Sequence, residues 1–78
     1  MTDYGNIETR IRIGSRLAEI RKSKSVSMLE LTEKTGLRRA TIWRVETGKF
    51  PATLDTLSKI ADALGCKIEV IEKDEAGN

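Results

Sequence analysis

Residues Met28–Thr47 read MLELTEKTGLRRATIWRVET, and this stretch predicts two short helices joined by a tight turn. Ser27 and Glu30 have the spacing of a capping box, in which each side chain bonds an unpaired backbone N–H at a helix start. Gly36 stands where this helix should end, because glycine adopts a positive φ without a steric clash. We therefore expect the first helix of the pair over residues 28–35.

The second helix of the pair is expected over about residues 38–46, and its two sides differ. Ile42 and Val45 are three residues apart, so both can face inward. The outward side is basic and carries Arg38, Arg39 and Arg44. This arrangement is typical of a helix-turn-helix, in which the first helix braces a second one that enters the major groove of DNA.

Two further helices are predicted around this pair. The first covers Ile7–Ser23, with an apolar stripe formed by Ile13, Leu17 and Ile20. Gly14 inside it costs about 1 kcal/mol in helix propensity, which close packing would explain. The last helix begins after the N-cap Thr53 and ends at Gly65. Its apolar face carries Leu54, Leu57, Ile60, Ala61 and Leu64. The expected core comprises Leu31, Leu37, Ile42, Val45, Leu57, Ile60 and Leu64.

Residues 66–73, CKIEVIEK, alternate and are β-branched, so they are predicted to form a short strand. A lone strand leaves its backbone groups unpaired, and no second strand is evident in the sequence. The simplest partner is the same strand of a second copy, which would pair across a two-fold axis. The strand residues expected at this contact are Cys66, Ile68, Val70 and Ile71. In the alternative interpretation, residues 66–72 form a helical turn or a frayed tail.

The length of 78 residues allows one small domain, whose core is marginal in a monomer. We place this domain at residues 9–65, between a flexible tail of residues 1–8 and a disordered tail of residues 74–78. The predicted fold is all-α: a compact four-helix domain with a short C-terminal strand used for dimerisation.

Several function classes are excluded by composition. The sequence has one cysteine and no histidine, which excludes most zinc sites, histidine acid–base catalysis and a Cys–His nucleophile. We therefore expect no enzymatic activity, no metal and no cofactor. No apolar stretch approaches the ~18 residues that cross a bilayer, and the N-terminus lacks the pattern of a secretory signal. The expected location is the cytoplasm, away from membranes.

The net charge of +2 conceals an asymmetry along the chain. Residues 1–50 contain eleven Lys/Arg and six Asp/Glu, which gives +5. Residues 51–78 contain three Lys/Arg and six Asp/Glu, which gives −3. A basic front half suits a protein that turns one face to phosphates, although solvated charged faces are also common.

Four motifs carry a resemblance to a known family. They are RL-x-x-x-R, LT-x-x-x-G, TI-x-R-x-E-x-GK and TL-x-x-IADALG, and together they span about residues 11–65. The sequence resembles the Cro/C1-type helix-turn-helix DNA-binding domain, also called lambda-repressor-like or the XRE family. The CKIEVIEK segment is further similar to the terminal strand of short antitoxin-type repressors.

The resemblance implies base readout by Arg39 and Ala40 at the start of the second motif helix, and Arg44, one helical turn further along the same helix, is a further candidate. An arginine can donate two parallel hydrogen bonds to guanine O6 and N7, whereas alanine can only touch a thymine methyl. Arg21 and Glu46 match positions that form a structural ion pair in many family members. For Arg39, the alternative role is a solvated surface charge.

Contacts with the DNA backbone are expected from three elements. Ser27, Thr41 and Lys49 resemble phosphate-contacting positions of the family. The charge of Arg38 and the indole N–H of Trp43 make both further candidates, with packing at the rim of the core as the alternative for Trp43. Two positions depart from the family: Arg38 replaces a capping Ser or Thr, and Met28 replaces a glutamine found in many relatives.

The sequence therefore predicts a sequence-specific DNA-binding transcriptional regulator. The expected form is a homodimeric repressor on a palindromic operator, with half-sites about 34 Å apart. One variant of this hypothesis is an antitoxin that represses its own operon and also binds a toxin protein. The alternative is a protein-interaction module that keeps the fold without binding DNA, against which the three arginines argue.

Overall fold

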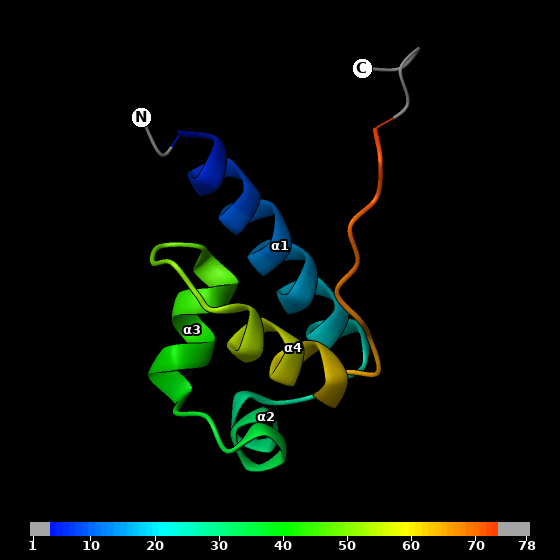
Figure 1. The fold of residues 1–78 in the computed structure, drawn as a ribbon. Coiled ribbons are helices and arrows are strands. Elements are labelled where there is room, and N and C mark those ends of the chain that lie inside the picture. The colour runs from blue at the N-terminus through cyan, green and yellow to red at the C-terminus, as the bar shows by residue number, and fades with distance from the viewer. Residues whose placement is uncertain (1–3, 74–78) are drawn as a thin grey trace.

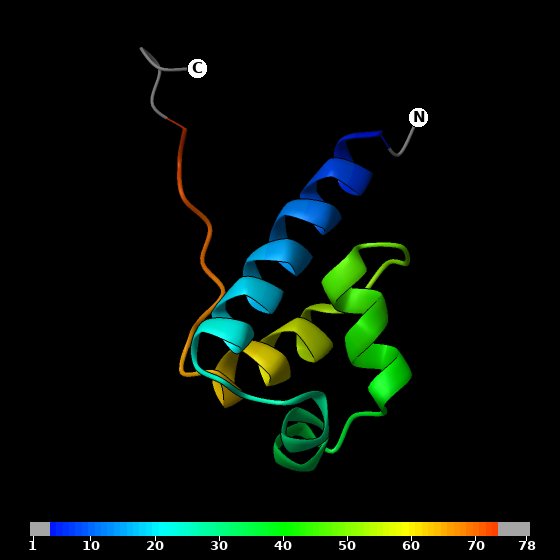
Figure 2. The same cartoon turned by 180° about the vertical axis from the view of Figure 1, so that it is seen from behind.

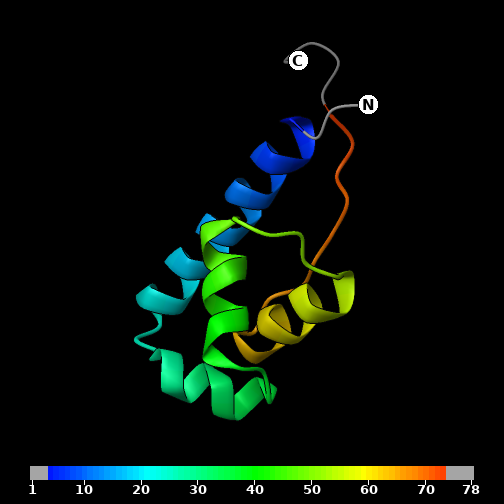
Figure 3. The same cartoon turned by 90° about the vertical axis from the view of Figure 1, so that its left-hand side faces the viewer.

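The computed structural model describes residues 4–73, which fold into four helices (Figure 1). These are α1 (Tyr4–Ser23), α2 (Met28–Thr35), α3 (Arg39–Thr47) and α4 (Leu54–Ala63). Figure 3 shows α1 and α3 side by side, with α2 across one end of the pair. The last helix, α4, packs against α2. The all-α, four-helix prediction is confirmed. Within the described range, no helix is both long and apolar enough to cross a membrane.

The helix ends follow the predicted caps. The Ser27 hydroxyl accepts a hydrogen bond from the Glu30 backbone N–H, and Thr53 likewise caps the start of α4. Gly36 ends α2 in the left-handed region, at φ 76°. Arg38 is the N-cap of α3 without a side-chain hydrogen bond, so α3 starts one residue later than expected. Its missing cap costs α3 about 1 kcal/mol relative to Ser or Thr.

A single apolar cluster lies between the helices. Its buried members are Leu17, Leu31, Ile42, Val45, Ile60, Ala61 and Leu64. Leu37 and Leu57, which were expected in the core, are partly buried and pack against it. Leu54 was expected on the inner face of α4, but its side chain is 63% exposed. It is the first residue of α4 and lies beyond the cluster, whose first buried residue in α4 is Ile60.

Gly14 marks the closest approach of α1 and α3. It is buried, and a Cβ atom here would overlap the carbonyl oxygen of Val45 and lie 3.0 Å from that of Glu46. The absence of a side chain lets the two helix backbones come together. This packing explains why α1 tolerates a glycine of low helix propensity.

The start of α1 corrects the expected N-terminal tail. The helix begins at Tyr4 instead of Ile7, so residues 4–8 are helical, while residues 1–3 lie outside the described range. Farther along the helix, Arg10 Nε donates a hydrogen bond to the Gly48 carbonyl oxygen over 3.2 Å, and this contact joins the N-terminal half of α1 to the loop after α3.

The predicted strand over residues 66–73 is wrong for the single chain. These residues form neither helix nor strand, and they run alongside the helical body (Figure 2). Val70 and Ile71 are 96% and 80% exposed, so the described structure provides neither a sheet nor an apolar surface to fix them. The tail predicted for residues 74–78 lies outside the described range.

Cys66 belongs to the end of α4 and not to a strand. Gly65 is left-handed at φ 76°, and the Cys66 N–H donates to the Ala61 carbonyl oxygen over 2.8 Å. These are features of a Schellman motif, in which a glycine reverses the chain and unpaired carbonyls of the last turn gain donors. The Lys24 ammonium also donates to the Leu64 carbonyl oxygen over 2.6 Å. Cys66 is therefore fixed by the helix that precedes it.

Gly14→Ala tests the close approach of α1 and α3. The added methyl group must push the Val45 carbonyl away, so we expect a loss of about 1–3 kcal/mol in the free energy of unfolding. Chemical denaturation monitored by circular dichroism measures this change. The control is Ser15→Ala at the next, exposed position of α1, which should be neutral or slightly stabilising. A Gly14→Ala variant as stable as this control would contradict the packing.

Candidate nucleic-acid interface

The outward side of α3, together with its N-cap residue, carries three arginines and is here called the α3 face. It comprises Arg38, Arg39, Ala40, Trp43 and Arg44, all of them exposed. Ile42 and Val45 point the opposite way into the core, at 0% and 5% exposure. The structure therefore brings the predicted base-reading side chains together on one helix face. Trp43 is 46% exposed and shares that face.

An ion pair joins α3 to α1. Arg21 Nε donates to one carboxylate oxygen of Glu46 over 2.7 Å, and Nη2 donates to the other over 3.1 Å. The two side chains are only 11% and 8% exposed. The pKa of Arg21 is raised, chiefly by these hydrogen bonds to Glu46, while burial acts in the opposite direction. Nη1 donates a third hydrogen bond to the Val26 carbonyl oxygen over 2.9 Å.

This ion pair orients three elements at once. Arg21 lies near the end of α1, Glu46 near the end of α3, and Val26 in the loop that leads to α2. A buried, bidentate pair specifies geometry more than it adds stability, because both charges lose hydration. Its consequence for the α3 face is that α3 cannot rotate about its axis without breaking the pair.

The residues expected to contact phosphates come from three separate places. Ser27 is the exposed N-cap of α2, where unpaired N–H groups favour an anion. Thr41 is half-buried on α3, which leaves less of it accessible than of its arginine neighbours. Lys49 is exposed in the loop directly after the left-handed Gly48, which ends α3.

Phe50 is a part of this surface that the sequence did not reveal. Its ring is 50% exposed, and the Arg44 guanidinium carbon lies over it at 5.2 Å from the ring centroid. The contact spans the end of α3 and the turn at Gly48, so no helical periodicity could predict it. An exposed aromatic beside Lys49, in a loop expected near DNA, was the available signal.

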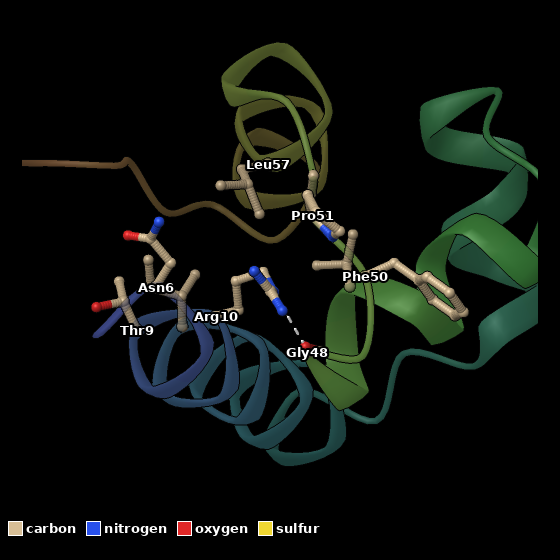
Figure 4. Close-up of a pocket in the computed structure, with 10 residues that line it drawn as sticks. Asn6, Thr9, Arg10, Gly48, Phe50, Pro51 and Leu57 are labelled. Atoms are coloured by element: carbon tan, nitrogen blue, oxygen red, sulfur yellow. Dashed lines mark hydrogen bonds between the residues drawn. The ribbon is translucent and has the colours of Figure 1, made fainter. Parts of the chain in front are cut away.

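A cavity of about 350 Å³ opens between α1, α4 and the loop after α3 (Figure 4). Asn6, Thr9 and Arg10 of α1 face Leu57 of α4 across it. Arg10 is the one titratable side chain in its lining. Within residues 4–73, no group of three or more Asp, Glu, Cys or His side chains is arranged to hold a metal ion.

The family described as Helix-turn-helix matches residues 17–71 of the chain. The chain is 32% identical over 63 residues to the immunity repressor protein of Bacillus phage phi105, in an alignment that covers 81% of the chain and 44% of that relative. The chain thus spans less than half the length of this repressor. It is also 37% identical over 57 residues to an uncharacterized HTH-type transcriptional regulator of Archaeoglobus fulgidus, covering 73% of the chain and 80% of the relative.

Two solved structures share the fold with a TM-score of 0.70 each. One is the restriction-modification controller protein C.AhdI from Aeromonas hydrophila, at 31% identity over 82% of this chain and 92% of that chain. The other is a toxin–antitoxin module from Streptococcus pneumoniae, at 33% identity over 94% of this chain and 83% of that chain.

Glu46→Gln tests whether the ion pair holds α3 in place. The amide keeps the shape but leaves the buried Arg21 charge unpaired, so we expect a loss of about 1.5–3 kcal/mol in the free energy of unfolding. Urea denaturation measures the loss.

Glu19→Gln is the matched control for this substitution. It breaks the Arg16–Glu19 pair, whose side chains are 68% and 69% exposed, and surface pairs of this kind contribute at most about 1 kcal/mol. Equal losses of unfolding free energy in the two variants would show that the Arg21–Glu46 pair holds α3 no more firmly than a surface ion pair would.

Proposed function

Since the chain belongs to the Cro/C1-type helix-turn-helix family, we propose that it is a sequence-specific DNA-binding transcriptional repressor. The observation that carries this proposal is the α3 face, on which three arginines point outward from a helix fixed to α1 by a buried ion pair. A rigidly held helix with a basic outer side can enter the major groove and present donors to base edges.

Within the groove, Arg39 and Arg44 read bases. Each can donate two parallel hydrogen bonds to guanine O6 and N7. Ala40, exposed between them, contacts a thymine methyl at most. The proposed specificity is therefore led by arginine and directed to G·C pairs.

Around the groove, phosphate contacts set the register. Arg38 and Trp43 contact phosphates from the α3 face, and the half-buried Thr41 of α3 contacts a phosphate beside them. Ser27 at the start of α2 and Lys49 after α3 add contacts from outside α3. Phosphate contacts position the domain on the duplex without reading its sequence.

The functional unit is a homodimer. One domain of this size buries a modest interface with DNA, and two copies on half-sites about 34 Å apart double the contacts and require a palindromic operator. Residues 67–73 are the proposed contact between copies, because Ile68, Val70 and Ile71 are exposed and their backbone lacks regular pairing. Such a regulator works in the cytoplasm.

A toxin protein is a second proposed partner. The observation in favour is the structural match to a toxin–antitoxin module over 94% of the chain. An antitoxin would bind its toxin and repress the operon that encodes both. Co-expression tests this role: the chain should relieve growth inhibition by a toxin encoded beside it, and unrelieved inhibition would reject the role.

A salt titration separates DNA binding from a pure protein-interaction role. Fluorescence anisotropy with a duplex selected from a random pool should show an affinity that falls linearly with salt concentration on logarithmic axes. Arg38→Ala should reduce this slope by about one phosphate contact. Lys59→Ala, which removes an exposed cation on α4, is the control and should leave the slope unchanged. Absence of binding at low salt, or binding indifferent to salt, would favour the protein-interaction module.

Arg39→Ala tests base readout. It should cost about 1–3 kcal/mol of binding free energy on the selected operator and relax discrimination at one base-pair position in each half-site. Binding to operators substituted at single positions measures this change. An equal loss on every sequence would show instead that Arg39 contacts phosphate.

A further inference from the structure

The ring of Phe50 stands outside the core and close to the α3 face. It is half-exposed, it is not a member of the apolar cluster, and it lies under the Arg44 guanidinium. Phe50 is among the residues that line the cavity, and Figure 4 shows its ring pointing away from Asn6 and Thr9. The contact with Arg44 therefore connects this ring to the α3 face.

The backbone around Phe50 holds the ring in a defined place. Gly48 is left-handed at φ 71°, and its N–H donates to the carbonyl oxygens of Arg44 and Val45. Its own carbonyl accepts from Arg10 of α1, and a Cβ at Gly48 would lie 2.8 Å from the α1 backbone. Pro51 follows Phe50 directly and fixes its own φ. The loop is therefore anchored at Gly48, and Pro51 restricts the backbone directly after the ring.

Contact with this ring restricts the Arg44 side chain and leaves its N–H donors free. Within residues 4–73 its guanidinium makes no hydrogen bond to protein, so all five N–H groups remain available. A guanidinium stacked on an aromatic face still projects these N–H groups from its edge. An arginine without such support would lose rotamer freedom when it binds, which weakens binding.

We propose that Phe50 is a positioning residue for DNA readout, which holds the Arg44 guanidinium so that its N–H edge meets a guanine. This inference rests on the proposed DNA-binding function. It assigns a specificity role to a loop residue outside the recognition helix. The effect is limited to the base pair that Arg44 reads.

Phe50→Leu and Phe50→Tyr separate the aromatic ring from its bulk. Leucine keeps an apolar side chain but removes the ring face, so we expect affinity for the selected operator to fall about two- to fivefold. Tyrosine keeps the ring and should bind like the parent. Unchanged thermal melting of both variants would show that the fold is intact, as the half-exposed position leads us to expect.

A double-mutant cycle with Arg44→Ala tests the mechanism. If Phe50 acts through Arg44, Phe50→Leu should have no further effect on affinity once Arg44 is alanine. In the parent background, Phe50→Leu should lower affinity for the selected operator. It should not lower affinity for an operator in which the base pair read by Arg44 is substituted. An equal loss in both backgrounds would overturn the inference, because the ring would then contact DNA by itself. An unchanged affinity of Phe50→Leu would also overturn it.

A measurement without DNA distinguishes failure of this inference from failure of the proposed function. Proton NMR of the free chain should show ring-current shifts of the Arg44 side-chain signals, retained in Phe50→Tyr and lost in Phe50→Leu. Shifts that are present while the parent fails to bind any duplex would reject the DNA-binding function alone. Shifts that are absent from the parent would reject the positioning role, whatever the affinity for DNA.

Discussion

The close approach of α1 and α3 at Gly14 is the constraint on which the rest of the structure depends. The helix backbones come together there because no Cβ stands between them, and the Arg21–Glu46 ion pair then fixes the rotation of α3. With α3 fixed, Ile42 and Val45 fill the core and the arginines are left outside. The contact with α1 thus contributes directly to the orientation of the α3 face.

Local features of the sequence were sufficient for most of the fold. Caps at Ser27 and Thr53, the left-handed Gly36 and the apolar spacing of Ile42 and Val45 each depend on neighbours within a few residues. Two errors lie at helix ends, which apolar periodicity defines poorly. The first helix, α1, begins at Tyr4 and not at Ile7, and Cys66 is held by a hydrogen bond to Ala61 at the end of α4.

The candidate site shows the same division. Helical spacing placed Arg39 and Arg44 on one exposed face, but it could not reveal Phe50, which reaches Arg44 across a turn. The structure also explains the surroundings of the two residues that depart from the family. Met28 is partly buried against the core, so it replaces a polar bracing residue with packing. Arg38 leaves the start of α3 uncapped and adds a cation there. Both changes agree with the proposal that the arginines read the bases.

The proposed function requires that the α3 face enters the major groove and reads guanines through arginine. Methylation interference on an operator selected from random DNA tests it most directly, because methylation of guanine N7 blocks the acceptor in the major groove, while methylation of adenine N3 lies in the minor groove. The account predicts that N7 methylation at guanines of each half-site prevents binding and that N3 methylation has little effect. Interference confined to adenine N3 would contradict it.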